Sequence, residues 1–355
     1  MLVAAGRVVH LACGWVCGPK FRGTRYDAAP SVNVDFFHMH LPSGLLTPSS
    51  LGRATDIIKA TPSGYSELLA LCSAAAPRLL VITGAGLSTE SGIPDYRSPA
   101  GSYSRGHKPV QHDEFVGSES RRKHYWSRSL RGWTPFASAQ PNSGHDALAR
   151  LDQAQLLLNI ITQNVDGLHQ QAGAVRVLEL HGSAHAVRCL SCGARYSRQH
   201  VQSQLTALNW WWLRKTREEQ QKAELRADGD AELALLPEDE GAFRVPPCGA
   251  CGGVLKTDVT FFGDSLPSPF KARTLELARE ADGVLVAGTS LMVLSAFRLV
   301  EAAAAKGAPI AVVNLGQTRL EKEGVPHLKV EAPCGATLSR LADDLLAARR
   351  AACAP

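Results

Sequence analysis

The chain has 355 residues, of which 45% are hydrophobic and 20% are charged, and its formal net charge is +5. This length can bury a substantial core, and no apolar stretch approaches the ~18 residues that a membrane-spanning helix needs, so we expect a soluble globular protein without a membrane partner. The charge is modest and mixed along the chain, so it does not indicate direct nucleic-acid binding.

The first residues have the composition of a targeting segment. Residues 1–26 contain four basic residues and no acidic residue, which is typical of an organelle transit peptide. A secretory signal fits less well, because no small-residue cleavage site follows the apolar run at residues 8–17. Residues 1–61 show no helical or alternating period and are interpreted as leader and linker. We expect a mitochondrial matrix protein, with a cytoplasmic protein bearing an untargeted tail as the alternative.

The folded part is predicted to begin near Tyr65 and to alternate between helices and short apolar strands. A helix is expected over residues 66–75, a strand over 79–82, and another helical start at Ser88 after a glycine turn. Further strands are predicted at 156–161, 177–180, 283–287, 310–313 and 328–330, with a helix at 296–305 among them. Strands separated by helices predict an α/β fold, a Rossmann-like doubly wound parallel sheet.

One segment interrupts this alternation at residues 187–259, where two cysteine pairs enclose a long polar stretch. We interpret it as an inserted small domain. The sheet domain is then divided into residues 62–186, with a helical insert near 105–140, and residues 260–348, followed by a tail at 349–355. The tryptophans at 210–212 are interpreted as a local core of the insert, and base stacking is the alternative.

The two cysteine pairs have the spacing of a metal site. Cys189 and Cys192 form one Cys-x-x-Cys pair, Cys248 and Cys251 form the other, and 55 residues separate the pairs. Four thiolates make the closed tetrahedral set of a structural zinc ion, with no position open to substrate. A redox role is the alternative. A disulfide framework is disfavoured because such frameworks belong to short secreted chains.

A glycine-rich turn follows the first predicted strand. Gly84 and Gly86 at a strand-to-helix turn let the backbone approach a pyrophosphate, and the helix start offers free N–H groups and a positive dipole end. The fingerprint of hydride-transferring dehydrogenases is incomplete, because Thr89 occupies the third glycine position and no acidic residue follows ~20 residues later. A dinucleotide site without hydride transfer is therefore favoured.

Residues 83–98 resemble the NAD-binding signature of the sirtuins. The resemblance continues through residues 162–169, 180–183, 288–291 and 313–316 and through the cysteine pairs, and it covers about residues 66–340. The chain is most similar to class II, the branch that holds vertebrate mitochondrial sirtuin four and plant sirtuin two. The resemblance implies an enzyme that uses NAD as co-substrate and acts on acylated lysines in proteins, with one structural zinc ion.

The resemblance also implies which residues meet NAD. The turn at Gly84, Ala85 and Gly86 would hold the diphosphate, a loop containing Arg97 and Tyr103 would close over the cofactor, and further residues would line the nicotinamide, ribose and adenine positions. The full implied set is Gly84, Ala85, Gly86, Ser88, Ile93, Asp95, Tyr96, Arg97, Tyr103, Gln163, Asn164, Val165, Asp166, Gly288, Thr289, Ser290, Asn314, Leu315, Gly316 and Cys334.

His181 is the candidate general base. It follows a predicted strand, at the edge where open α/β sheets place their ligands, and its unperturbed pKa of about 6.5 lets it accept a proton at cellular pH. By resemblance, Asn164 and Asp166 complete the catalytic set. Breaking the bond from ribose to nicotinamide creates an oxocarbenium-like centre, as in glycoside hydrolysis, and the acyl oxygen of the substrate captures it. Nicotinamide and O-acyl-ADP-ribose are the expected products.

A possible determinant of acyl specificity lies on a predicted helix. Tyr125 and Arg128 are three residues apart and so share a helix face. In class II sirtuins such a pair is associated with acyl chains that end in a carboxylate, which an arginine fork can bind. The alternative is a surface helix with a solvated arginine.

Three further expectations concern one substitution and two alternative functions. Thr257 stands where relatives usually carry proline, and we expect it to alter a turn after the cysteine module. The same residues could also serve an NAD-dependent protein ADP-ribosyltransferase. A non-catalytic NAD-sensing zinc module is disfavoured, because a binding-only protein has no need of a base at His181.

Overall fold

The computed structural model describes residues 57–59 and 62–352, and every structural statement below concerns these residues. The expected leader and its import signal lie outside them, apart from Ile57–Lys59. Within this part of the chain, no helix is both long and apolar enough to cross a membrane.

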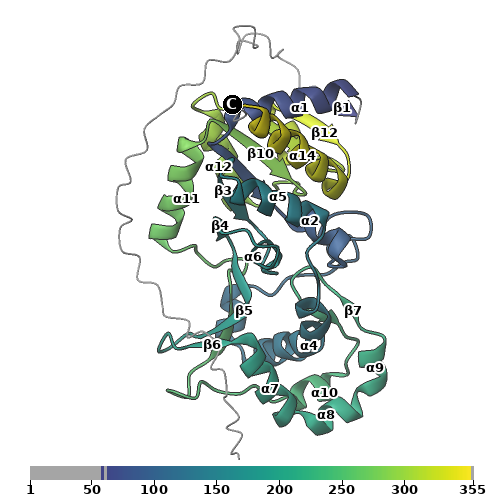
Figure 1. Cartoon of the computed structure of the whole chain (residues 1–355). Coiled ribbons are helices and arrows are strands. Elements are labelled where there is room, and N and C mark those ends of the chain that lie inside the picture. Colours follow the sequence, from purple (N-terminus) through teal and green to yellow (C-terminus); the bar gives the residue numbers. More distant parts are fainter. Residues whose placement is uncertain (1–56, 60–61, 353–355) are drawn as a thin grey trace, which may run out of the picture. The chain divides into compact units, whose positions relative to one another are not determined.

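The main sheet of the described residues has seven parallel strands in the order β1-β12-β11-β10-β2-β3-β4 (Figure 1). From β2 the chain runs outward through β3 to β4, and from β10 it runs the other way through β11 to β12. This is the order of a doubly wound dinucleotide-binding sheet, and it confirms the predicted fold class. The strands are β1 (Ile57–Lys59), β2 (Leu79–Thr83), β3 (Leu157–Thr162), β4 (Val177–Glu179), β10 (Gly283–Ala287), β11 (Ile310–Val313) and β12 (Leu328–Glu331).

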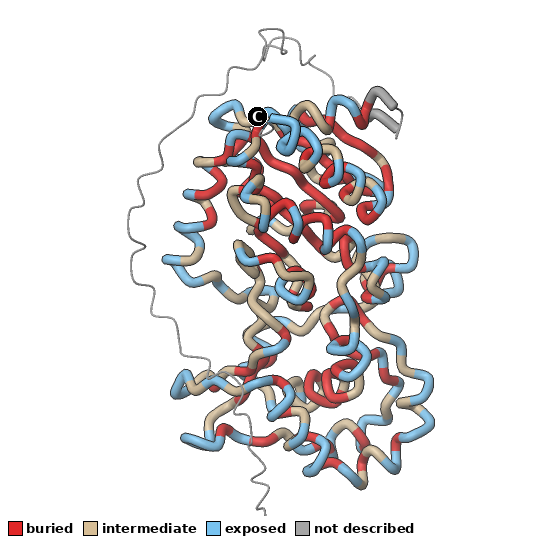
Figure 2. Tube along the Cα trace, in the orientation of Figure 1, coloured by how far each residue is buried: buried red, intermediate tan, exposed pale blue. Residues whose placement is uncertain are grey.

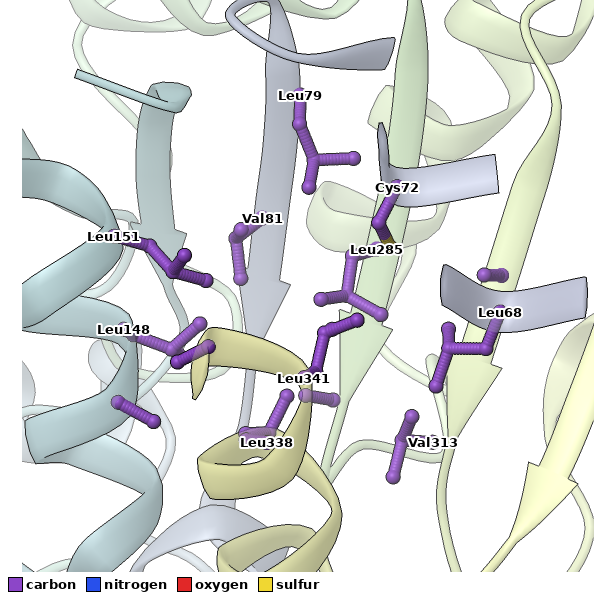
Figure 3. Close-up of a cluster of buried hydrophobic side chains, with 14 of the residues drawn as sticks. Leu68, Cys72, Leu79, Val81, Leu148, Leu151, Leu285, Val313, Leu338 and Leu341 are labelled. Atoms are coloured by element: carbon purple, nitrogen blue, oxygen red, sulfur yellow. The ribbon is translucent and has the colours of Figure 1, made fainter. Parts of the chain in front are cut away.

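Helices cover both faces of this sheet, because successive strand residues point to opposite faces. Leu79 and Val81 pack into one buried cluster with α1, α5 and α14 (Figure 3), whereas Leu80 and Ile82 pack into another with α11 and α12. The central strands are therefore buried along their length (Figure 2). The helices are α1 (Pro62–Ala75), α5 (Ser143–Gln153), α11 (Ser268–Glu280), α12 (Leu294–Ala304) and α14 (Cys334–Ala352).

Several element boundaries differ from the prediction. Residues 57–59, assigned to the linker, form edge strand β1 beside β12, and α1 begins at Pro62. The helix expected to start at Ser88 is instead the single turn α2 (Ala85–Ser88), followed by the 3₁₀ turn η2 (Thr89–Ser91) and by Gly92 in the left-handed region. The expected tail is helical through Ala352, as part of α14.

A second group of elements surrounds the four cysteines. Its antiparallel sheet has the order β6-β5-β9, and helices from two separate segments share its core: Phe115 of α3 and Trp126 of α4 lie in one buried cluster with Val187, Val201 and Trp212. The elements are α3 (His112–Gly117), α4 (Glu119–Ala137), β5 (Gly182–Cys189), β6 (Arg195–Ser197), α7 (Arg198–Leu208), α8 (Trp210–Lys215), α9 (Arg217–Gln221), β7 (Glu224–Leu225), β8 (Ala231–Glu232), α10 (Pro237–Ala242) and β9 (Leu255–Val259).

We call residues 112–137 and 182–259 the small module. It is larger than the predicted insert at 187–259, because α3 and α4 were assigned to the sheet domain. The local-core interpretation holds for Trp212, which is fully buried and donates from Nε1 to the carbonyl of Asp239, while Trp210 is 60% exposed. Thr257 does not alter a turn, since it is a buried residue inside β9.

Candidate functional site

The predicted site residues follow the carboxyl ends of neighbouring parallel strands. Gly84 comes after β2, Gln163 after β3, His181 shortly after β4, Gly288 after β10 and Asn314 after β11. The strand order reverses between β2 and β10, and ligands of open α/β sheets bind at such a reversal. The main sheet therefore brings segments from across the sequence to one edge.

Two glycine turns pack against each other at this reversal. The N–H of Gly86 donates to the carbonyl of Gly288 at 2.8 Å, and a Cβ on Gly86 would lie 2.8 Å from that oxygen. Gly288 has φ +63°, and a Cβ there would lie 2.3 Å from the nitrogen of Leu87. Glycine is thus required by close backbone approach within the chain itself. We call these two packed turns of small residues the cradle, and their small size suits a diphosphate.

Gln163 and Thr289 connect the two halves of this cradle. The Nε2 of Gln163 donates to the carbonyl of Thr83 at 3.1 Å and to Oγ1 of Thr289 at 2.9 Å. The same Oγ1 accepts from the N–H of Leu291, which has φ +55°, an uncommon conformation for leucine. A strained residue held by hydrogen bonds is characteristic of functional loops.

Ser88 joins the two predicted catalytic residues that follow β3. Its hydroxyl donates to Oδ2 of Asp166 at 2.7 Å and accepts from Nδ2 of Asn164 at 3.0 Å. Oδ1 of Asp166 accepts the N–H of Leu168, and Nδ2 of Asn164 also donates to the carbonyl of Gly84 at 3.1 Å. Both side chains are therefore held in fixed orientations before any ligand binds.

Two buried histidines lie next to this hydrogen-bond network. Nδ1 of His145 accepts from the N–H of Asn142, so its Nε2 carries the proton that faces Ser88. His169 lies with Nε2 2.9 Å from Oγ1 of Thr83, and burial lowers its pKa to about 3. Both histidines are fully buried, and hydrogen-bonding groups of the chain surround them.

His181 lies where the chain passes from the main sheet to the small module. Its Nδ1 is 3.0 Å from the carbonyl oxygen of Gln163, and its Nε2 is 2.8 Å from Oγ of Ser295. Because a carbonyl only accepts, Nδ1 carries the proton and Nε2 has the free electron pair. Burial lowers the pKa of His181 from its ordinary value, so the ring is neutral at pH 7.

The loop predicted to close over NAD is held by its own residues. Oδ1 of Asp95 accepts the backbone N–H groups of Arg97 and Ser98, at 3.1 and 2.9 Å. The rings of Tyr96 and Tyr103 lie 5.1 Å apart, and the guanidinium of Arg97 lies 5.1 Å from the ring centre of Tyr103. The side chains of Tyr96, Arg97 and Tyr103 therefore contact one another within the loop.

An apolar wall joins this loop to the segment after β3. Ile93, Val165 and Leu168 share a buried cluster with Ala184 of β5 and Trp133 of α4. Ile93 and Val165, both predicted as cofactor-binding residues, thus lie where the main sheet meets the small module.

The residues predicted for the adenosine end lie beyond β11. Nδ2 of Asn314 donates to the carbonyls of Leu315 and Gly316 at 2.8 and 3.1 Å, which fixes this turn. Cys334 begins α14 and is buried, with Sγ 3.5 Å from the carbonyl of Val313. The carbonyl of Ser290 accepts the N–H of Arg319 at 2.8 Å, so α13 (Arg319–Glu323) supports the turn after β10.

The four paired cysteines lie together in the small module. Their Sγ atoms all lie within 4.8 Å of one another, with 3.5 Å between Cys189 and Cys251 and 3.8 Å between Cys192 and Cys248. A tetrahedral zinc ion with Zn–S bonds of about 2.3 Å requires S–S separations of about 3.8 Å. The residues present therefore fit a closed structural zinc site.

The proposed acyl-specificity pair is engaged within the small module. The hydroxyl of Tyr125 lies 2.7 Å from Oγ1 of Thr257 in a buried position. Arg128 donates to Oε1 of Glu240 at 2.8 Å and to the carbonyl of Leu233 at 3.1 Å. The guanidinium of Arg128 is therefore not free to bind a substrate carboxylate, because it already binds the carboxylate of Glu240.

Ser295 is a site residue that sequence reasoning missed. It is the second residue of α12 and its hydroxyl contacts the predicted base His181, which is 114 positions away in the sequence. The motif that ends at Leu291 does not include it, and a single serine at a helix start carries no distinctive signal.

Known proteins resemble this chain in sequence. The model of the Sir2 family matches residues 84–295. The NAD-dependent protein deacylase SRT2 of Arabidopsis thaliana is 46% identical over 275 residues, covering 75% of this chain and 73% of that protein. The NAD-dependent protein deacylase Sirt4 of Drosophila melanogaster is 44% identical over 269 residues, covering 75% and 83%.

Solved structures show the same fold. A Sir2–p53 peptide–NAD+ complex superposes with a TM-score of 0.60 at 27% identity, covering 78% of this chain and 97% of that one. The crystal structure of a Sir2 homolog–NAD complex has a TM-score of 0.58 at 26% identity, covering 80% and 94%.

Proposed function

This chain belongs to the Sir2 family, and from that premise we propose that it is an NAD-dependent protein-lysine deacylase. One observation carries the proposal: Nδ1 of His181 is committed to the carbonyl of Gln163, so a neutral imidazole holds its free electron pair at Nε2. A general base is what a deacylase needs and a binding protein does not.

The oriented side chains suit the chemistry of NAD cleavage. Both amide hydrogens of Asn164 are engaged by the chain, one by Gly84 and one by Ser88, so Oδ1 is the atom it can offer to a ligand. We assign Asn164 and Asp166 to the nicotinamide side of the pocket, with the apolar Ile93 and Val165 beside them. Fixed polar groups in a water-poor pocket stabilise developing charge.

His181 acts after nicotinamide has left the ribose. The carbonyl oxygen of the acyl-lysine captures the oxocarbenium-like carbon, which gives an imidate linked to the ribose. Nε2 of His181 accepts the proton of a ribose hydroxyl, directly or through its neighbouring hydroxyl, as that oxygen attacks the imidate carbon. Addition of water then releases the free lysine and O-acyl-ADP-ribose.

The test is to incubate the purified chain with NAD and a panel of acylated peptides, and to follow nicotinamide release and peptide mass. Loss of the acyl group together with O-acyl-ADP-ribose is the expected result. His181→Tyr should abolish acyl loss and retain zinc. A gain of ADP-ribose mass on a protein or peptide, without acyl loss, would identify an ADP-ribosyltransferase instead. Absence of both reactions and of NAD binding would contradict the proposal.

We also propose that the chain works in the mitochondrial matrix. The support is compositional: residues 1–26 carry four basic residues and no acidic one. Residues 1–61 fused to a fluorescent protein should direct it to mitochondria, and replacing the four basic residues by glutamine should leave it in the cytoplasm. Cytoplasmic fluorescence of the unmodified fusion would contradict the assignment.

A further inference from the structure

We propose that Ser295 is a positioning residue for the general base, holding the imidazole of His181 so that Nε2 faces the reacting ribose. The inference rests on the proposed function, because it concerns the residue that the proposed reaction uses as its base. The role of Ser295 is inferred from its contact with His181 in the structure.

The hydrogen bonds of His181 assign a direction to the contact with Ser295. Nδ1 donates to the carbonyl of Gln163 at 3.0 Å, so Nε2 is unprotonated and must accept. Oγ of Ser295 lies 2.8 Å from Nε2 and therefore donates its hydrogen to it. Both ring nitrogens are thus fixed, one by the segment after β3 and one by α12. A ring held at both nitrogens keeps one orientation, with its basic atom toward the start of α12.

The start of α12 is itself held firmly. The guanidinium of Arg319 lies 4.9 Å from the ring centre of Phe297, and the same side chain donates to the carbonyl of Met292 at 3.3 Å. The backbone N–H of Arg319 donates to the carbonyl of Ser290. Contacts on both sides of Ser295 therefore anchor its backbone to α13. The side chain can act as a fixed support for the imidazole.

A serine hydroxyl suits both protonation states of the base. It has one donor hydrogen and two acceptor electron pairs. It donates to Nε2 while the imidazole is neutral. After Nε2 has taken the ribose proton, Oγ can accept from the imidazolium N–H. Alanine offers neither bond. The single electron pair of Nε2 can accept only one hydrogen at a time. During proton transfer the ribose hydroxyl therefore replaces the serine hydroxyl at Nε2.

The test compares Ser295→Ala with Ser295→Thr and with the matched control Ser203→Ala. Ser203 lies on α7, is exposed, and bonds only to the carbonyl of Gln199. Two reactions are measured: deacylation, which needs the base, and exchange of labelled nicotinamide into NAD, which reverses the step before the base acts. We expect Ser295→Ala to lower kcat for deacylation about tenfold, equivalent to one hydrogen bond, while KM for NAD changes by less than about twofold.

Nicotinamide exchange should persist in Ser295→Ala, and Ser295→Thr should restore deacylation because it returns the hydroxyl. Ser203→Ala should match the original chain in both reactions. Unchanged deacylation in Ser295→Ala would overturn the proposal. An equal loss of exchange and deacylation, with a lowered melting temperature, would also overturn it by showing a structural role alone.

A measurement without catalysis separates this proposal from the proposed function. The ¹⁵N resonance of Nε2 of His181 reports a hydrogen bond that this atom accepts, and it should move downfield in Ser295→Ala, where that bond is lost. If the unmodified chain does not deacylate, the proposed function fails, yet this shift still tests the contact. An unchanged resonance would show that Ser295 does not hold Nε2.

Discussion

Ser88 donates a hydrogen bond to Asp166 across 2.7 Å, from the turn after β2 to the segment after β3. The same oxygen accepts from Asn164, so one hydroxyl fixes two predicted catalytic side chains. These side chains are therefore oriented by the chain before ligand arrives, and catalytic groups gain from such preorganisation.

The first prediction concerns this hydroxyl. Ser88→Ala should lower kcat/KM for NAD by about tenfold or more, because Asn164 and Asp166 lose their shared partner inside a buried network. Steady-state kinetics with varied NAD measures the effect. Ser138→Ala is the control, since that exposed hydroxyl bonds only to the carbonyl of Pro135. Equal kcat/KM for Ser88→Ala and Ser138→Ala would refute the role of the Ser88 hydroxyl.

The second prediction is a pH profile. His181 must be unprotonated to act as base, and burial lowers its pKa. The base therefore stays competent as pH falls to its ordinary pKa of about 6.5, and activity is lost only below that. kcat/KM for the acyl peptide, measured from pH 5 to 8 with stability checked at each pH, should be nearly level above 6.5. If kcat/KM fell to half of its maximum at or above pH 6.5, the burial argument would be contradicted.

The third prediction concerns the two packed glycine turns. Gly288→Ala places a Cβ 2.3 Å from the nitrogen of Leu87 at a residue with φ +63°. We expect a loss of about 2 kcal/mol in unfolding free energy, and weaker NAD binding, because the turn must shift. Gly117→Ala is the matched control, since a Cβ there meets nothing within 4 Å. Calorimetry of unfolding and of NAD binding checks both effects, and similar values for the two variants would be inconsistent with the packing.

The fourth prediction concerns the metal. Cys192→Ser should abolish zinc binding and lower the melting temperature by several degrees or more, because the thiolates hold the core of the small module together. Metal analysis and thermal unfolding measure these changes. Cys353→Ser is the control and should retain one zinc ion per chain. A zinc-free Cys192→Ser protein with unchanged melting would show that the metal is not structural.

The fifth prediction concerns acyl specificity. Arg128→Ala should lower stability by about 2 kcal/mol, because Glu240 loses its arginine partner in a partly buried ion pair and is left with the His124 ring. The ratio of activities on acidic and neutral acyl peptides should stay constant, since Arg128 is not a free carboxylate site. Arg121→Ala is the control, because Arg121 lies on α4 like Arg128 and forms an exposed ion pair with Glu114 of α3. A selective loss of activity on acidic acyl groups would restore the specificity hypothesis.

The sequence predicted the sheet well because its strands are short apolar runs with polar or glycine neighbours. The strands at 283–287 and 310–313 were predicted to the residue. It did not predict that α4 packs in the small module, since Trp126 meets β9 across 129 positions. Arg128 and Ser295 depend likewise on partners 112 and 114 positions away. Such long-range contacts leave no local pattern in a single sequence.

The segment that carries His181 is also one of the covalent connections between the parallel sheet and the cysteine-bearing sheet. β5 begins at the next residue, Gly182, whose added Cβ would lie 1.9 Å from the carbonyl of Asp258. Anyone who exchanges the metal-bearing part between relatives must therefore cut and rejoin the backbone beside the imidazole. A chimera made at this junction alters the geometry of the base along with the identity of the transplanted part.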